Sequence, residues 1–173
     1  VVAGGLSVGV PGVLRMLELA HKEHGKLPWR DLFQPAIQLA EKGFDISPRL
    51  ADAIARDPQL KNFPDAARYF LDAKGQPRAA GSRLTNPAFA ATLRTIADKG
   101  VDAFYTGDIA RDIAAAVSKA PRNATPMTAQ DISSYKAEQR DPAGSIYRIW
   151  FVCGAPPPSS GGIATLQILG LLE

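Results

Sequence analysis

The sequence is poor in the side chains that build most metal centres and nucleophilic sites, with one cysteine and two histidines in 173 residues. The single cysteine, Cys153, excludes an internal disulfide bond and is expected to pack as a small apolar side chain. No apolar run approaches the roughly 20 residues that cross a bilayer. No cluster of Lys and Arg stands out within a net charge of +3. We therefore expect neither a membrane span nor a nucleic-acid partner.

The composition that remains is that of a globular domain with a real core. Hydrophobic residues make up 46% of the chain and charged residues 21%, which argues against disorder. The chain starts at Val1 instead of methionine. We therefore expect a processed or excised piece of a longer protein, from which no targeting segment is readable.

Apolar spacing and capping residues predict a chain dominated by helices. Ser47 and Asn86 each precede a proline, and Thr128 with Asp131 forms a capping box, so each of these marks a helix start. In the second predicted helix, Pro35 should mark a kink or a restart. Phe104 and Tyr105 should wedge two helices together. The predicted helices span 13–24, 28–42, 48–56, 64–71, 87–99, a stretch after Asp108, and 128–135.

The last quarter of the chain changes to extended structure. Residues 136–140 and 145–152 are predicted strands, with a turn at 141–144 between them. Both alternating sets of side chains in the second strand are apolar, so we expect both of its faces to be covered. A helix over 163–172 follows the segment 156–162, whose three prolines hold the backbone extended. A helix N-terminus after this elbow would offer unpaired N–H groups to an anion or an oxyanion.

The residues alone provide no complete active site. Ser159 and Ser160 lack the Gly-x-Ser-x-Gly pattern of a nucleophile elbow, and the histidines lie far upstream in the sequence. His21 and His24 are one helical turn apart, but no third metal ligand is apparent. Cys153 has no nearby histidine in sequence to activate its thiol. The purely structural interpretation of 156–162 is a rigid elbow that connects a strand to a buried helix.

Five blocks in order give the chain a resemblance to a known family. The segment 156–162, Pro-Pro-Pro-Ser-Ser-Gly-Gly, and the run 163–169 after it resemble a signature of the γ-glutamyltranspeptidases. Four earlier blocks are similar to that family in the same order. They are SVGVPG at 7–12, HGKLPW at 24–29 with PAIQLAEKGF at 35–44, FYTG at 104–107, and TAQDISSY at 128–135.

The resemblance implies a fold class that is mainly α with a small β component (α+β). It identifies 1–173 as a single fragment of the large subunit of an N-terminal-nucleophile hydrolase with an αββα core. Residues 13–135 would form a helical lobe, and 136–173 a strand, elbow and helix that dock on that core. With its sheet partners absent, the fragment would expose apolar surface and self-associate.

The resemblance also implies the chemistry of the parent protein. The N-terminal threonine of a small subunit, released from the same precursor, would attack γ-glutamyl amides such as glutathione, with its own α-amine as base. That threonine is expected after Glu173, and the arginine that binds the donor carboxylate before Val1. We therefore expect no catalytic residue, cofactor or metal here, and an inactive fragment. Ser159, Ser160, Gly161 and Gly162 are expected to support the wall of the substrate pocket.

Two other functions remain open at this point. A related acylase would act on another amide, such as a β-lactam side chain, and the pocket arginine would distinguish it. A non-enzymatic helical scaffold would bind a partner protein, and its parent would lack a processing threonine. The family resemblance implies a periplasmic or secreted parent. Donor and acceptor preference, and the balance of hydrolysis against transfer, are not readable from this sequence.

Overall fold

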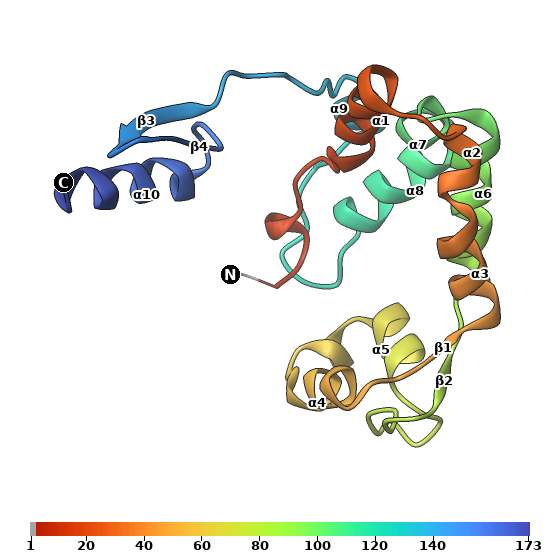
Figure 1. The fold of residues 1–173 in the computed structure, drawn as a ribbon. Helices are drawn as coiled ribbons and strands as arrows, with labels where there is room; N and C mark the ends of the chain where they lie inside the picture. The colour runs from red at the N-terminus through yellow and green to blue at the C-terminus, as the bar shows by residue number, and fades with distance from the viewer. Residues whose placement is uncertain (1–2) are drawn as a thin grey trace. The chain divides into compact units, whose positions relative to one another are not determined.

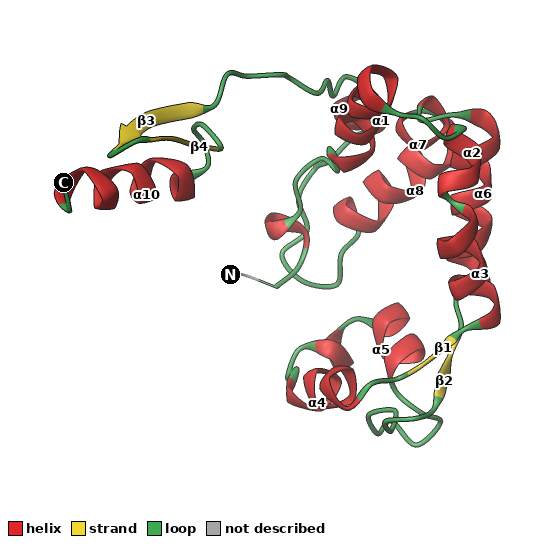
Figure 2. Cartoon of the chain, viewed as in Figure 1, coloured by secondary structure: helices red, strands yellow, loops and turns green. Residues whose placement is uncertain are grey.

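The computed structural model describes residues 3–173, which form two compact units divided between Lys136 and Ala137. Helices dominate the first unit, and the second consists of one hairpin and one helix (Figures 1 and 2). The described strands form two separate two-stranded sheets. The predicted α+β class is therefore confirmed. Within 3–173, no helix combines the length and the apolar character that a membrane crossing requires.

Most predicted helices of the first unit are present within one or two residues. Its described α-helices are α1 (Val13–His24), α2 (Trp29–Leu32), α3 (Gln34–Lys42), α4 (Pro48–Arg56), α5 (Pro64–Phe70), α6 (Pro87–Lys99), α7 (Asp102–Tyr105), α8 (Gly107–Ser118) and α9 (Ala129–Ser133). Short 3₁₀ turns lie at Gly5–Ser7 and Leu60–Asn62. Phe33 separates α2 from α3, so Pro35 lies in the first turn of a restarted helix.

The predicted caps hold the starts of three helices. Ser47 Oγ accepts a hydrogen bond from the Leu50 amide at 3.1 Å, and Asn86 Oδ1 accepts one from the Phe89 amide at 2.9 Å. The capping box of Thr128 and Asp131 is complete in both directions. The hydrogen bonds from the side chain and backbone of Thr128 lower the pKa of the Asp131 carboxyl.

An excursion between α3 and α6 carries its own small core. Strand β1 (Phe44–Asp45) leaves α3 and pairs antiparallel with β2 (Arg83–Leu84), which leads back to α6. Between them, α4 and α5 bury a cluster of Ile46, Ile54, Leu71 and Leu84. The sequence did not predict these strands, because two residues are too few to show an alternating pattern.

The remaining helices of the first unit share two adjoining apolar clusters. One joins α3 to α6 around Ile37 and Ile96, and the other joins α7, α8 and α9 around Tyr105 and Ile132. Leu14, Trp29 and Phe104 pack against both clusters. The first unit therefore has a core of its own, while Leu17, Leu39 and Phe89 stay exposed.

Tyr105 connects the loop before α1 to this core, as the predicted aromatic wedge. Its side chain is fully buried, and its hydroxyl donates to the Pro11 carbonyl at 2.6 Å. The same hydroxyl accepts from the Arg15 amide at 3.2 Å, and the Arg15 guanidinium lies 4.4 Å from the ring centroid. Burial raises the pKa of the Tyr105 hydroxyl. The loop 8–12 is therefore fixed by a residue about 90 positions later in the chain.

The second unit is a hairpin with a helix on it. Strands β3 (Ala143–Tyr147) and β4 (Trp150–Gly154) pair antiparallel, and α10 (Ser160–Leu171) packs on both. The predicted strand at 136–140 is wrong, because that segment has no strand partner. The predicted strand at 145–152 is interrupted by a tight turn at Arg148 and Ile149, with Arg148 at φ 54°. The turn residues are Arg148 and Ile149, and no Gly, Asn or Pro marks the turn.

The helix α10 covers only one face of the hairpin. Residues directly opposite in an antiparallel pair share a face, so Ala143 with Gly154 and Ser145 with Val152 lie on one side. That side includes the less exposed residues of the hairpin and carries α10. The other side holds Ile146, 68% exposed, and Phe151, 70% exposed. Within residues 137–173, α10 covers one face of β4 and the other face is exposed.

Candidate functional site

The elbow between β4 and α10 is the candidate site that the sequence singled out. The Ser159 amide donates to the Pro156 carbonyl at 3.1 Å, which closes the turn. Arg140 Nη1 donates to the Pro157 carbonyl at 3.0 Å and ties the elbow to the segment that precedes β3. The elbow is therefore fixed by backbone contacts of its own unit.

Two glycines allow the start of α10 to lie directly on β4. A Cβ placed on Gly162 would meet the Ala155 carbonyl oxygen at 2.5 Å, and one on Gly154 would meet the Gly162 Cα at 2.7 Å. Real side chains do not tolerate such distances, so both positions exclude every residue except glycine without a backbone shift. Gly161, by contrast, has open space where a Cβ would stand. Only Gly162 of this pair is required by packing.

The two serines of the elbow are exposed at the start of α10. Ser159 is the N-cap residue, at φ −71° and ψ 125°, but its side chain makes no capping hydrogen bond. Within residues 3–173, neither serine hydroxyl has a hydrogen-bond partner. The first N–H groups of a helix have no partner inside it, so this end of α10 keeps donors available. The elbow can therefore offer hydrogen-bond donors to a neighbouring group.

The elbow does not contain a catalytic constellation. No histidine occurs between 137 and 173, so the second unit holds no imidazole base for either serine. Cys153 is exposed on the side of the hairpin that α10 leaves uncovered. What the arrangement provides is a fixed backbone corner with exposed hydroxyls, which suits support of a pocket made by other residues.

The two histidines of the first unit lie beside an apolar cavity of about 620 Å³. His21 Nε2 is 2.8 Å from the Leu27 carbonyl oxygen, and its ring meets Trp29 edge-on with centroids 5.3 Å apart. His24 Nε2 is 3.6 Å from a carboxylate oxygen of Glu23. No group of three or more metal-ligating side chains occurs among residues 3–173. The pair is thus engaged with a carbonyl and a carboxylate of its own surroundings.

Sequence reasoning missed two hollows of the first unit. The apolar cavity is assembled from α1, α2, α3 and α6, and a polar one lies between α5 and the start of α6. Their residues are scattered along the chain without a motif. The spacing of arginine and aromatic residues in the sequence did not predict either cavity.

Comparison with known proteins identifies the family. A family model described as gamma-glutamyltranspeptidase matches residues 1–173. The chain belongs to the gamma-glutamyltranspeptidase family.

Individual relatives agree with this membership. The chain is 37% identical to a glutathione hydrolase proenzyme of Escherichia coli over 170 residues, covering 97% of the chain and 29% of that protein. It is 37% identical to the acylase ACY 1 proenzyme of a Pseudomonas strain over 173 residues, covering 99% of the chain and 30% of that protein. The crystal structure of Helicobacter pylori gamma-glutamyltranspeptidase matches with a TM-score of 0.89 at 32% identity, over 98% of this chain and 48% of that one. The chain thus spans less than a third of these two proenzymes.

The contact of Gly162 with β4 leads to a prediction with an internal control. Gly162→Ala should weaken the second unit by about 1–3 kcal/mol, because its methyl group meets backbone atoms that cannot rotate away. Gly161→Ala should leave stability unchanged or raise it slightly, since alanine favours helix and nothing lies within reach. Hydrogen exchange of the β4 amides, measured by mass spectrometry, should accelerate only in the Gly162 variant. Equal exchange in the two variants would show that the contact does not hold α10 in place.

Proposed function

We propose that this chain forms part of the large subunit of an enzyme that transfers or hydrolyses γ-glutamyl groups of glutathione-like donors. The observation that carries the proposal is the family match along all 173 residues. The similarity to proteins named glutathione hydrolase proenzyme supports a parent that is cleaved into two subunits. The small subunit of the same precursor is then the partner of this chain.

The reactive group belongs outside this chain in this proposal. The elbow has exposed serines without a base, and the two histidines lie in the other unit against Leu27 and Glu23. An N-terminal threonine needs neither, because its own α-amine takes the proton from its hydroxyl. We propose that this threonine and the arginine for the donor carboxylate lie in the flanking parts of the parent. A periplasmic or secreted parent is part of the same proposal.

A second candidate is an acylase that acts on a different amide. The observation that favours this candidate is the similarity to the acylase ACY 1 proenzyme. The sequence identity to that protein equals the identity to the glutathione hydrolase proenzyme of Escherichia coli. Both candidates share the threonine chemistry and differ in the acyl group that the pocket recognises. The chain itself supplies no residue that separates them.

The substrate preference of the purified parent protein distinguishes the two candidates. It should release nitroaniline from γ-glutamyl-p-nitroanilide, and the isolated 173-residue chain should not. A glutaryl amide of a β-lactam nucleus serves as the competing substrate. Release from the glutaryl amide alone would replace the first candidate by the second, and turnover by the isolated chain would refute both.

We further propose that Ser159, Ser160, Gly161 and Gly162 support the wall of the substrate pocket in the parent. Their exposed hydroxyls and the uncapped start of α10 support this role, because such donors can hold neighbouring backbone in place. The double change Ser159→Ala and Ser160→Ala should raise KM for the donor in the parent protein, at unchanged subunit cleavage. The matched control is Ser145→Ala, on the hairpin. Kinetics identical to the unchanged enzyme would discard the role.

The exposed apolar residues of the hairpin and of α10 are proposed to dock on the central sheets of the parent. Ile146 and Phe151 are exposed on the hairpin, and Leu171 at the end of α10 is 87% exposed. A two-stranded hairpin is marginal on its own, and apolar patches of this kind mark an interface. In the isolated chain, a second copy can cover the same surface.

Self-association of the isolated chain follows from this surface. At about 50 µM, a range in which exposed apolar surface drives association, sedimentation velocity should show dimers or larger species. Phe151→Lys should shift the chain toward the monomer, because the charge would have to be desolvated in the contact. Leu27→Lys, at an exposed leucine of the first unit, should leave the distribution unchanged. A monomeric unchanged chain would contradict the docking surface.

A further inference from the structure

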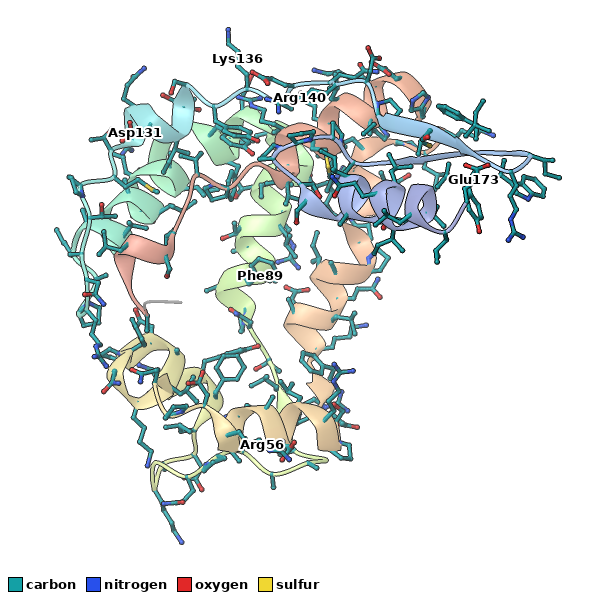
Figure 3. The ribbon with its side chains drawn as sticks, turned by 90° about the vertical axis from the view of Figure 1, so that its left-hand side faces the viewer. Arg56, Phe89, Asp131, Lys136, Arg140 and Glu173 are labelled. Atoms are coloured by element: carbon teal, nitrogen blue, oxygen red, sulfur yellow. The ribbon has the colours of Figure 1, made fainter. Side chains whose placement is uncertain are left out.

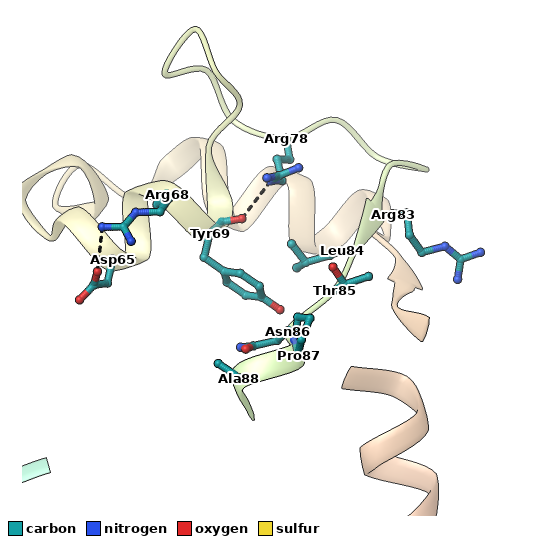
Figure 4. Close-up of a pocket in the computed structure, with 10 residues that line it drawn as sticks. All are labelled: Asp65, Arg68, Tyr69, Arg78, Arg83, Leu84, Thr85, Asn86, Pro87 and Ala88. Carbon is teal, nitrogen blue, oxygen red and sulfur yellow. Dashed lines mark hydrogen bonds and ion pairs between the residues drawn. The ribbon is translucent and has the colours of Figure 1, made fainter. Parts of the chain in front are cut away.

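A polar cavity of about 490 Å³ lies between α5 and the start of α6 (Figure 4). It belongs entirely to the first unit and is separate from the elbow. Three arginines and one aspartate are its charged residues. The cavity is lined by Asp65, Arg68, Tyr69, Arg78, Arg83, Leu84, Thr85, Asn86, Pro87 and Ala88.

Arg78 is held at this cavity by two hydrogen bonds to carbonyl oxygens of α5. Its backbone amide donates to the Phe70 carbonyl at 3.1 Å, and its Nε donates to the Tyr69 carbonyl at 2.9 Å. The residue is half-buried, and no carboxylate among residues 3–173 pairs with it. The two terminal NH₂ groups therefore keep their donors free while the guanidinium is held in one orientation. Such a pre-positioned fork fits a carboxylate or a phosphate.

The other charged residues at the cavity are already paired. Arg68 forms an ion pair with Asp65 at 3.2 Å, in which both side chains are mostly exposed. Arg83 Nε lies 3.1 Å from Asp45 Oδ1, and its Nη1 donates to the Gly43 carbonyl at 3.0 Å. Figure 4 shows the Arg83 side chain directed away from Tyr69. One positive charge, that of Arg78, is thus left without a counterion.

Neutral hydrogen-bond donors of Tyr69, Thr85 and Ala88 also line the cavity. Figure 4 shows the Tyr69 hydroxyl directed toward the start of α6. Neither this hydroxyl nor that of Thr85 has a hydrogen-bond partner within residues 3–173. At the start of α6, Pro87 has no N–H and Asn86 accepts from the Phe89 amide, which leaves the Ala88 amide without an acceptor. These donors add directional contacts to the charge of Arg78.

We propose that this cavity binds a small oxyanion, the carboxylate or phosphate group of a metabolite, between Arg78 and the donors of Tyr69 and Thr85. The single unpaired cation matches one anionic group, and the volume leaves room for the body of a small ligand. The proposal is independent of the γ-glutamyl reaction. Its test therefore needs no turnover.

Calorimetric titration of the full-length parent protein tests the site. Inorganic phosphate and succinate are the two probes, each at an ionic strength held constant with sodium chloride. Saturable binding of either probe is expected, and the tighter one identifies the class of anion. Binding no stronger than that of chloride would overturn the proposal.

Variants locate the binding in this cavity. Arg78→Gln should weaken binding about tenfold or more, because a charge-assisted fork is lost. Thr85→Val should weaken it about threefold or more, since one hydroxyl donor is lost. Arg56→Gln, on the neighbouring helix α4, is the control and should bind as the unchanged protein does (Figure 3). If Arg78→Gln does not fold, the comparison of Thr85→Val with the control decides. Equal affinity in all folded variants would overturn the proposal.

Discussion

Helix α10 has no charged side chain from Ser160 to Leu171, so every side of it prefers an apolar neighbour. The hairpin beneath it supplies such a neighbour on one side only. That contact depends on Gly154 and Gly162, where backbone meets backbone. The position of the elbow, the exposure of its serines and the uncovered face of β3 and β4 all follow from how α10 lies on the hairpin.

The first unit encloses part of its apolar surface by itself. Its helices enclose three apolar clusters. The helix caps and the buried Tyr105 hydroxyl form hydrogen bonds with polar groups that packing removes from water. Among residues 3–173, no buried side-chain polar atom lacks a partner. Residues 137–173, by contrast, include no buried residue, so the second unit has no closed core of its own. The exposed side chains of Phe151 and Leu171 support the proposal that the second unit docks on another part of the parent.

The sequence predicted the elements whose signals are local. Ser47, Asn86 and the pair of Thr128 and Asp131 marked helix starts that the structure confirms, because a cap depends on residues three positions apart. The hairpin turn at Arg148 was missed, since its geometry is set by strand pairing and not by turn residues. The short pair of β1 and β2 was missed because residues 40 positions apart make it.

At the candidate site too, the features with a local sequence signal were predicted and those that depend on long-range packing were not. The motif at 156–162 pointed to the elbow, and the family resemblance gave its meaning. The sequence did not show which of the two glycines is indispensable. The difference between Gly162 and Gly161 arises only because β4 approaches Gly162 in the folded chain. The cavity around Arg78 was not readable either, since α5, β2 and α6 meet there only in the folded chain.

In the proposed function, this chain has a supporting role and the covalent chemistry belongs to another part of the parent. Intact and peptide mass spectrometry of the parent, after reaction with a slowly turned-over γ-glutamyl donor, tests this directly. We expect two polypeptides, with the γ-glutamyl adduct on the N-terminal threonine of the smaller one. An adduct on any residue of 1–173, or an uncleaved polypeptide that turns over the donor, would contradict it.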